Sequence, residues 1–505
     1  MNFTVTGITI ETNGLTPEQL EQAKIFSGKN AGICYMADKY FDSAVSDPAK
    51  ALPRFYDTAK NAHHSIADHV RVEVVLEDVS KMLAIVLNSL QDYATSEKSG
   101  RYTIMTGNSE KEQELYEKWG KIFEDRIIEL DPTVNDAWLK QMFNKKYPDN
   151  GYEIKDGKKL EVEPKLEASV DKGADAYWRE KLITSPNKPS KKLAQENARY
   201  VLSVFTRSTT MGYSTSLRQW NYIYDWCQKY LNQYMPRYDK DYVDAMAGGD
   251  SKVTIVYKGS DTPVSYFEEQ LYFDFLKLSN FIYDNLYIEE LRDTKDRCFE
   301  FLLNYAGNGK HPMAKYDFSC FEPDGYTGEY LYDKNTHSSN DHIDVTYNVA
   351  YTASLVQIAQ AERHRTLKYF MLENFNISGR EYFIPEFIKG TEYEAEWLAD
   401  MKSVEDIIPQ GTMVGIIETG HVADFILKCK ERLCGRAQWE IMNQTKLTAE
   451  RFIDSADNGD VSEVFKSYAE ELKGTYNTVT TKCELCKGCK EPCKHGAKNA
   501  LTRLF

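Results

Sequence analysis

Two short polar segments contain the residues of this chain best suited to binding an anionic ligand. One is the loop Glu97-Lys98-Ser99-Gly100-Arg101-Tyr102, and the other is the triplet Arg363-His364-Arg365. An arginine guanidinium group is planar and permanently charged, so it matches the oxygens of a phosphate or the anionic edge of a cofactor. Each segment is therefore a candidate site for a phosphorylated ligand.

Both segments can also be explained without a function. The triplet follows a predicted helix, and the helix dipole favours basic residues at a C-terminus by about 0.3–1 kcal/mol each. Serine and glycine are common turn residues, so the loop could be only a turn. Taken singly, the two segments leave this choice open.

The two segments end a similar succession of elements. In the first succession, Ser65 is followed by a strand at 70–76, a helix at 79–90 and the loop at 97–102. In the second, Ser338 is followed by a strand at 342–349, a helix at 353–361 and the triplet at 363–365. An order that recurs over such a length indicates a tandem duplication.

The chain has 505 residues, more than one core usually contains, so we expect two large domains and a tail. The expected fold class is α+β, in which a mixed sheet of the α/β type has flanking helices and the whole domain occurs twice. The expected bounds are 1–245 for the first half, 263–475 for the second half and 476–505 for a Cys/Lys-rich tail. Gly and Asp residues within 247–261 suggest the boundary. Residues 144–192 read as a long surface excursion.

Capping residues and periodicity predict further helices at 17–26 behind Thr16, at 109–130, at 193–205 and within 265–305. In the second of these helices, apolar residues recur near helical spacing and predict one buried face. They are Leu115, Trp119, Ile122, Phe123 and Leu130.

Composition narrows the classes of partner. The net charge of -15 argues against binding to duplex nucleic acid, which needs a basic face. No apolar run approaches the roughly 18 residues of a membrane span, so no membrane partner is expected. The first residues lack a basic region followed by an apolar core, and we therefore expect a cytoplasmic protein.

Four of the ten cysteines stand close together near the C-terminus. They are Cys483, Cys486, Cys489 and Cys493. Four thiolates on a short polar segment suit structural zinc, our first choice, or an iron-sulfur cluster. We expect the tail to bind one of these metals.

The motifs together resemble the flavin-dependent thymidylate synthases. The shared pattern is H-x-S-x-x-D/E-H, then R-H-R, then E-x-S-G-R-Y, and later A-R-x-x-L and R-x4-A-Q-W-E-I. The resemblance covers about half of the chain. It implies an FAD-dependent enzyme related to homotetramers of shorter chains, in which each active site lies between subunits.

In the first half, the resemblance implies mainly a nucleotide-binding role. It matches the family at one flavin position, Ser65, and at the dUMP positions Glu97, Ser99, Gly100, Arg101 and Arg199. Ser89-Leu90-Gln91 stands where the triplet is expected. The first half would therefore no longer bind the flavin through such a triplet.

The second half shows the converse pattern. It matches the family at the flavin positions Ser338, Arg363, His364 and Arg365, and at the dUMP positions Gln360, Arg363 and Arg432. The resemblance makes Arg363 and His364 catalytic through orientation and polarisation of the uracil. Asn221 and His421 are candidates for the later flavin contacts.

The second half has no E-x-S-G-R-Y loop. Its Ser378-Gly379-Arg380 comes too late in the sequence, and Glu405-Asp406-Ile407-Ile408-Pro409 replaces A-R-x-x-L. The second half would therefore no longer bind the nucleotide through these two motifs.

Each half thus retains what the other lacks. We expect a homodimer that imitates a tetramer, with each complete site combining the loop of a first half with the triplet of a second half. The implied reaction converts dUMP to dTMP, with methylenetetrahydrofolate as carbon donor and NADPH-reduced FAD as hydride source. Two alternatives stay open, a dUMP hydroxymethylase and a non-catalytic nucleotide-binding relic of the fold. The retained triplet favours an enzyme, because a relic has no need to bind flavin.

Overall fold

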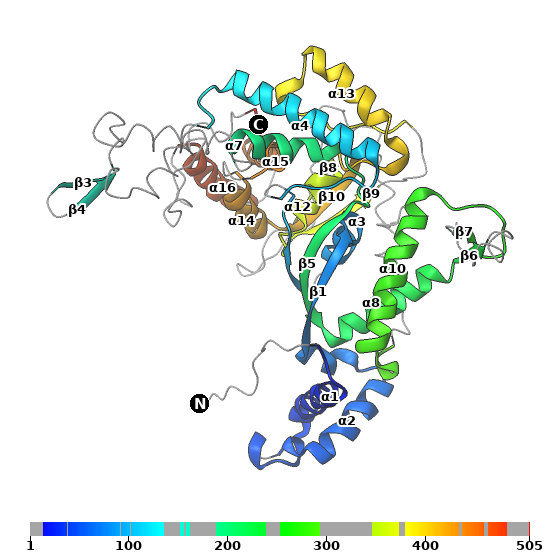
Figure 1. The fold of residues 1–505 in the computed structure, drawn as a ribbon. Helices are drawn as coiled ribbons and strands as arrows, with labels where there is room; N and C mark the ends of the chain where they lie inside the picture. The colour runs from blue at the N-terminus through cyan, green and yellow to red at the C-terminus, as the bar shows by residue number, and fades with distance from the viewer. Residues whose placement is uncertain are drawn as a thin grey trace. The chain divides into compact units, whose positions relative to one another are not determined.

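The computed structural model describes residues 14–37, 39–90, 92–100, 103–135, 152–155, 158–161, 188–238, 253–292, 346–372, 379–433, 437–458, 463–481 and 504–505. The chain divides into two compact units that alternate along the sequence. Unit 1 comprises residues 1–98, 207–317 and 370–377, and unit 2 comprises 99–206, 318–369 and 378–505. Figure 1 labels the helices and strands.

Unit 1 contains an antiparallel sheet with the strand order β1 (Arg71–Ser80), β5 (Arg207–Ser216), β2 (Tyr93–Glu97). Ser80 caps the next helix, α3 (Lys81–Asn88), by accepting a hydrogen bond from the Leu83 backbone. Ser216 caps α8 (Leu217–Leu231) by accepting from the Gln219 backbone. A serine cap satisfies backbone N–H groups that a helix leaves open, so each strand ends where its helix begins.

The second sheet has the same plan. Its strand order is β8 (Thr346–Ser354), β10 (Met413–His421), β9 (Lys368–Leu372). Ser354 caps α12 (Leu355–Ala361) by accepting from the Gln357 backbone. Helix α14 (Val422–Arg432) follows β10 as α8 follows β5. Both sheets therefore have the first strand at one edge, the third in the middle and the second at the other edge (Figure 1).

The remaining elements are helices and two small hairpins. In unit 1 they are α1 (Pro17–Gly32), α2 (Pro48–Lys60), α10 (Tyr266–Asn285) and the strands β6 (Tyr234–Tyr238) and β7 (Val253–Tyr257). In unit 2 they are α4 (Glu110–Leu130), β3 (Tyr152–Lys155), β4 (Lys158–Glu161), α7 (Pro189–Ala198), α13 (Glu392–Lys402), α15 (Trp439–Asn458) and α16 (Glu463–Thr481).

The core of unit 2 combines helices from both halves of the sequence. Trp119 and Phe123 of α4 are fully buried against Trp397 and Met401 of α13. The Trp119 and Trp397 rings meet edge to face with centroids 4.9 Å apart. The Trp119 indole also donates to Asp400 at 2.9 Å. Aromatic contacts of this kind fix α4 against α13.

Backbone pairing joins the two halves at a second place in unit 2. Val204 N donates to Ile408 O at 2.9 Å, and Gln410 N donates to Leu202 O at 2.8 Å. Both partners follow a short 3-10 turn, Arg199–Val201 in the first half and Glu405–Ile407 in the second. Since the two turns stand at the same distance before β5 and β10, Glu405 occupies the place that Arg199 has in the first half.

Most predicted elements are confirmed, including the α+β class and the capping box at Thr16. The predicted strand 70–76 runs on to Ser80, because a bulge with Asp78 at φ 52° interrupts its pairing but does not end it. The predicted helix 193–205 ends at Ala198. The strand β7 lies inside the expected boundary at 247–261.

The buried face of the helix 109–130 is confirmed at Trp119 and Phe123, while Leu115 and Ile122 are partly buried. Leu130 was wrongly placed on this face. It is 38% exposed, because it is the last residue of the helix and lies beyond Ile127, which is fully buried in the core.

Trp119→Ala should lower the free energy of unfolding by about 3–5 kcal/mol, since the change empties a fully buried site. Leu130→Ala on the same helix should change it by less than about 0.5 kcal/mol. Urea unfolding followed by tryptophan fluorescence and circular dichroism measures both. Equal midpoints for the two variants would contradict this account of the core.

Candidate functional site

The basic triplet forms the turn that follows α12. His364 N donates to Ala361 O at 2.9 Å, and Leu367 N donates to His364 O at 3.1 Å. Arg363 and Arg365 are exposed, whereas the His364 side chain is only 4% exposed. The turn therefore presents two guanidinium groups outward and one imidazole inward.

His364 is held in its neutral form. Burial, together with the nearby charges of Arg432 and Lys428, lowers the pKa of His364 to about 2. Its Nε2 has no hydrogen-bond partner among the described residues, and the nearest carboxylate, Glu431, lies 3.6 Å away and is half exposed. The ring can therefore offer a hydrogen bond but not a positive charge.

Two predicted dUMP residues of the second half lie together. Arg432, at the end of α14, donates to the backbone oxygen of Gln360 at 3.5 Å. Nε2 of Gln360 is buried and has no hydrogen-bond partner within the described chain. A buried amide without a partner costs free energy unless a ligand or water satisfies it, so this amide is suited to a ligand.

Arg199 lies close to Gly100 of the loop that begins at Glu97. The side chain is buried, and its Nη2 donates to Oε1 of Gln438 at 2.8 Å. A Cβ atom at Gly100 would come within 3.1 Å of the Arg199 guanidinium group, so glycine lets the loop approach it closely. Ser99 is half buried, and its backbone oxygen accepts from Thr103 N at 3.1 Å.

A chain of hydrogen bonds leads from Arg199 to the start of α12. Gln438 donates to the Tyr200 hydroxyl at 2.5 Å, and this hydroxyl donates to Oε2 of Glu440 at 2.8 Å. Glu440 also accepts from Ser354 N at 2.7 Å and from Ser354 Oγ at 2.6 Å. An arginine of the first half is thus linked to the helix that carries the triplet of the second half.

The groups in this chain are strongly perturbed. Burial raises the pKa of Glu440, while the hydrogen bonds from Ser354 oppose that rise. Burial also raises the pKa of Tyr200 well above its usual value, so the hydroxyl keeps its proton. Gln438, Tyr200 and Glu440 were not among the predicted site residues, although all three lie within the motifs A-R-x-x-L and A-Q-W-E-I.

Other predicted residues lie elsewhere or outside the description. In unit 1, Ser65 is exposed, and the largely buried Glu97 carboxylate pairs with Lys81. Asn221 is buried, and its Oδ1 accepts from Ile288 N at 2.6 Å, which gives it a structural role. His421 is exposed just before α14. Arg101, Ser338 and the four tail cysteines Cys483, Cys486, Cys489 and Cys493 lie outside the described residues.

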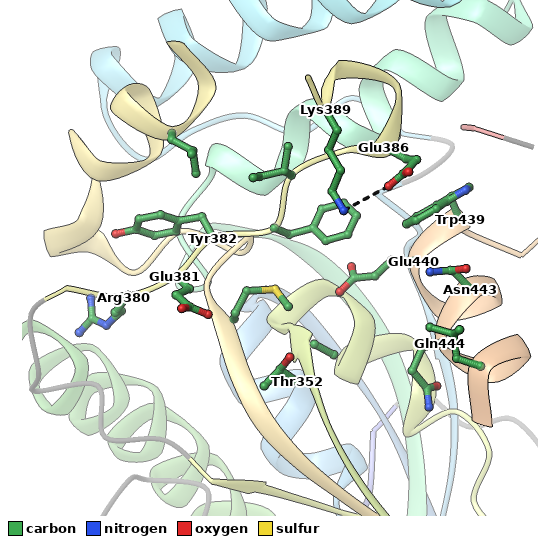
Figure 2. Close-up of a pocket in the computed structure, with 16 residues that line it drawn as sticks. Thr352, Arg380, Glu381, Tyr382, Glu386, Lys389, Trp439, Glu440, Asn443 and Gln444 are labelled. Carbon is green, nitrogen blue, oxygen red and sulfur yellow. Dashed lines mark ion pairs between the residues drawn. The ribbon is translucent and has the colours of Figure 1, made fainter. Parts of the chain in front are cut away.

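A cavity of about 630 Å³ lies at the N-terminus of α15, and Glu440 of the hydrogen-bond chain is one of the residues that line it (Figure 2). Trp439 and Asn443 of α15 form one wall, and Tyr382 stands opposite. An ion pair of 3.3 Å between Glu386 and Lys389 borders it. Its aromatic and amide groups could hold a flat polar ring. The predicted site residues do not line this cavity.

The described residues include no group of three or more His, Cys, Asp or Glu side chains placed to hold a metal ion. None of the described helices has the length and apolar character that a bilayer span requires. The metal site predicted in the tail stays a prediction.

The residues at the triplet fit an anionic flavin cofactor. Arg363 and Arg365 are exposed planar cations, and neutral His364 lies between them in the sequence. The buried Gln360 amide lies one helical turn earlier. This donor set suits an anion with a neighbouring heterocycle better than a metal ion, since guanidinium groups cannot be metal ligands.

His364→Gln should reduce the loss of stability at acid pH. Below about pH 6.5 the unfolded chain protonates this histidine and the folded chain does not. As the pH is lowered from about 6.5, the free energy of unfolding therefore falls by up to about 1.4 kcal/mol for each pH unit. Urea unfolding from pH 7 to 4.5 should show a shallower slope in H364Q than in the wild type. The exposed-site change His69→Gln is the matched control, and equal slopes in H364Q and wild type would contradict the buried neutral ring.

One comparison with known proteins found a match, over part of the chain. No curated protein matches the sequence. Residues 27–234 match the model of one family, described as thymidylate synthase complementing protein. The matched region contains the loop at 97–102 and Arg199, and it ends before the triplet. Residues 27–234 are therefore similar to the thymidylate synthase complementing proteins, the family of flavin-dependent thymidylate synthases that the motifs resemble.

Proposed function

We propose that the chain converts dUMP to dTMP, using methylenetetrahydrofolate as carbon donor and FAD reduced by NADPH. The observation that carries this proposal is the hydrogen-bonded route from Arg199 through Gln438, Tyr200 and Glu440 to Ser354. It connects the nucleotide motif of the family to the helix of the basic triplet, as a site made from both halves requires.

In this proposal the nucleotide phosphate binds to the basic residues of the loop and its surroundings. Arg199 lies under the loop that contains Ser99, Gly100 and Arg101, and Glu97 precedes that loop. From the second half, Gln360, Arg363 and Arg432 would complete the nucleotide set. Guanidinium groups would supply charged hydrogen bonds to the phosphate, and the Gln360 amide would supply a neutral one.

The triplet Arg363-His364-Arg365 would hold the flavin, with Ser65 and Ser338 as further contacts. When bound, FAD supplies the hydride that turns the transferred methylene into a methyl group. Arg363 and neutral His364 would orient the uracil and polarise it with donors fixed in advance.

The equal strand order of the two sheets and the equal serine caps support a tandem duplication. In such a chain the two halves replace two subunits, and we propose that two chains form a homodimer with two complete sites. The sites would be the two that combine a first-half loop with a second-half triplet.

The direct test is incubation of the purified chain with dUMP, methylenetetrahydrofolate, FAD and NADPH, followed by mass spectrometry of the nucleotide. Formation of dTMP supports the proposal. Formation of 5-hydroxymethyl-dUMP instead would show a hydroxymethylase with the same site. Unchanged dUMP, with flavin bound and bleached by NADPH, would reject both reactions.

Arg199→Ala should weaken dUMP binding by about ten- to hundredfold, because a charged hydrogen bond contributes about 1.5–3 kcal/mol. Deoxyuridine, which has no phosphate, should bind the variant nearly as well as it binds the wild type. Calorimetry with both ligands measures the difference. Arg380→Ala in the second half is the matched control, and an equal effect there would contradict the assignment of the loop.

Arg363→Ala should reduce bound flavin while the fold is kept, since the side chain is exposed and the helix ends before it. Ser89→Ala, at the corresponding position of the first half, should leave flavin binding unchanged. Absorbance of the purified proteins near the flavin band gives the occupancy, with one flavin per chain expected in the wild type. Full occupancy in Arg363→Ala, or two flavins per wild-type chain, would contradict the proposal.

A further inference from the structure

A fully buried ion pair lies in unit 2. Lys428 of α14 and Glu418 of β10 are 2.6 Å apart, and neither side chain is exposed at all. Glu418 also accepts from the Tyr351 hydroxyl at 2.9 Å, and Lys428 donates to Gln444 at 3.3 Å. Burying two charges costs several kcal/mol per ion in lost hydration, so close contact and further hydrogen bonds are needed to offset that cost.

The pair is connected to the helix of the triplet. Gln357 of α12 donates to Oε1 of Gln444 at 3.3 Å and contacts the Tyr351 hydroxyl at 3.5 Å. These contacts join α12 to β8, β10, α14 and α15. Four residues after Lys428, Arg432 touches the Gln360 backbone, so α14 is linked to α12 directly at Arg432 and through Gln444 at Lys428.

The charges around the His364 ring come from the same helix. Lys428 and Arg432 both lower the pKa of His364, and Glu431 lies 3.6 Å from its Nε2. Around Lys428 itself lie Glu418 of β10, the Tyr351 hydroxyl of β8 and the Tyr369 ring of β9, whose centroid is 5.5 Å away.

The first half builds the same architecture without these charges. Corresponding residues of the two halves are found by counting from the residue that caps each helix. Ser80 of α3 is aligned with Ser354 of α12, and Ser216 of α8 is aligned with His421 of α14. Leu83 corresponds to Gln357, Tyr213 to Glu418 and Ile223 to Lys428. All three first-half residues are buried.

This comparison separates folding from function. Replacing a buried ion pair by well-packed apolar groups is often neutral or stabilising, so the fold alone gives no reason to keep one. The same count places Ser89 opposite Arg363. The half that lacks the basic triplet thus also lacks the ion pair and the glutamine that connects it to the helix.

We propose that Lys428 and Glu418 are positioning residues for the triplet, fixing α12 through Gln357 and Tyr351. The inference deepens the proposed function and rests on it where flavin binding is concerned. The pair does not itself touch the reacting atoms. It determines where the triplet lies.

The test removes both charges together, by Glu418→Gln with Lys428→Met, because the single change would leave one charge buried and alone. Gln at 418 keeps an acceptor for Tyr351. The matched control is Ile223→Met in the first half. Three measurements are made on each full-length protein: thermal unfolding, the His364 ring chemical shifts from NMR of ring-labelled histidine, assigned with H364Q, and FAD and dUMP affinity by titration.

The double variant should remain folded, with the His364 ring resonances displaced from their wild-type positions. Its FAD affinity should fall at least about tenfold, and its dUMP affinity should fall much less, because Arg199 and the loop are unchanged. Lys428→Arg, which keeps the charge, should retain the wild-type His364 ring resonances. Ile223→Met should behave as wild type.

A folded double variant with the wild-type His364 ring resonances and the wild-type FAD affinity would overturn the inference. Failure of the proposed function has a different signature, which the wild type itself would show: it would bind neither FAD nor dUMP, or it would bind flavin and leave dUMP unchanged. The NMR measurement needs neither ligand, so it tests the effect of the pair on His364 in either case.

Discussion

The buried carboxylate of Glu440 is the group on which the arrangement of the candidate site depends. A carboxylate without partners in a protein interior is very unfavourable, so its surroundings must supply hydrogen bonds. Ser354 provides two, from its backbone and its hydroxyl, and Tyr200 provides a third. These demands fix the first turn of α12 relative to the segment of Arg199. A similar contact occurs in unit 1, where Ser80 donates to buried Asp274 at 2.5 Å.

Around this common plan the two halves have become chemically different. Where one has exposed Arg363, the other has buried Ser89, and where one has Arg199, the other has Glu405. The residues of the first half that correspond to Glu418 and Lys428 are the aromatic Tyr213 and the apolar Ile223. Each difference changes a polar or charged group, while the serine caps of α3 and α12 and the strand order are kept.

The sequence was sufficient to predict the elements that carry the site. Apolar runs mark the strand and the helix before each polar segment, because this signal is local. The ends of elements were less predictable. The helix expected at 193–205 stops at Ala198, since the following residues pair with 408–411 of the other half, and this pairing is not visible locally.

The partners of the site residues could not be predicted in the same way. Arg199 and Gln438 are 239 positions apart, and only the folded chain brings them together. Glu418 and Lys428 are ten residues apart and read as ordinary surface charges, although both are fully buried. Burial of a charge depends on packing from several elements, which one sequence does not display.

The backbone pairing of 202–204 with 408–410 has a consequence for how such a protein can change. In a symmetric pair of identical chains, residues at the twofold axis meet their own copies, so every substitution there is made twice and like charges face each other. Here Ser203 is bridged to Pro409, and the turns beside them begin with opposite charges, Arg199 and Glu405. A single chain that contains both sides of such a contact can alter one side alone, and so reach combinations that no symmetric homodimer can contain.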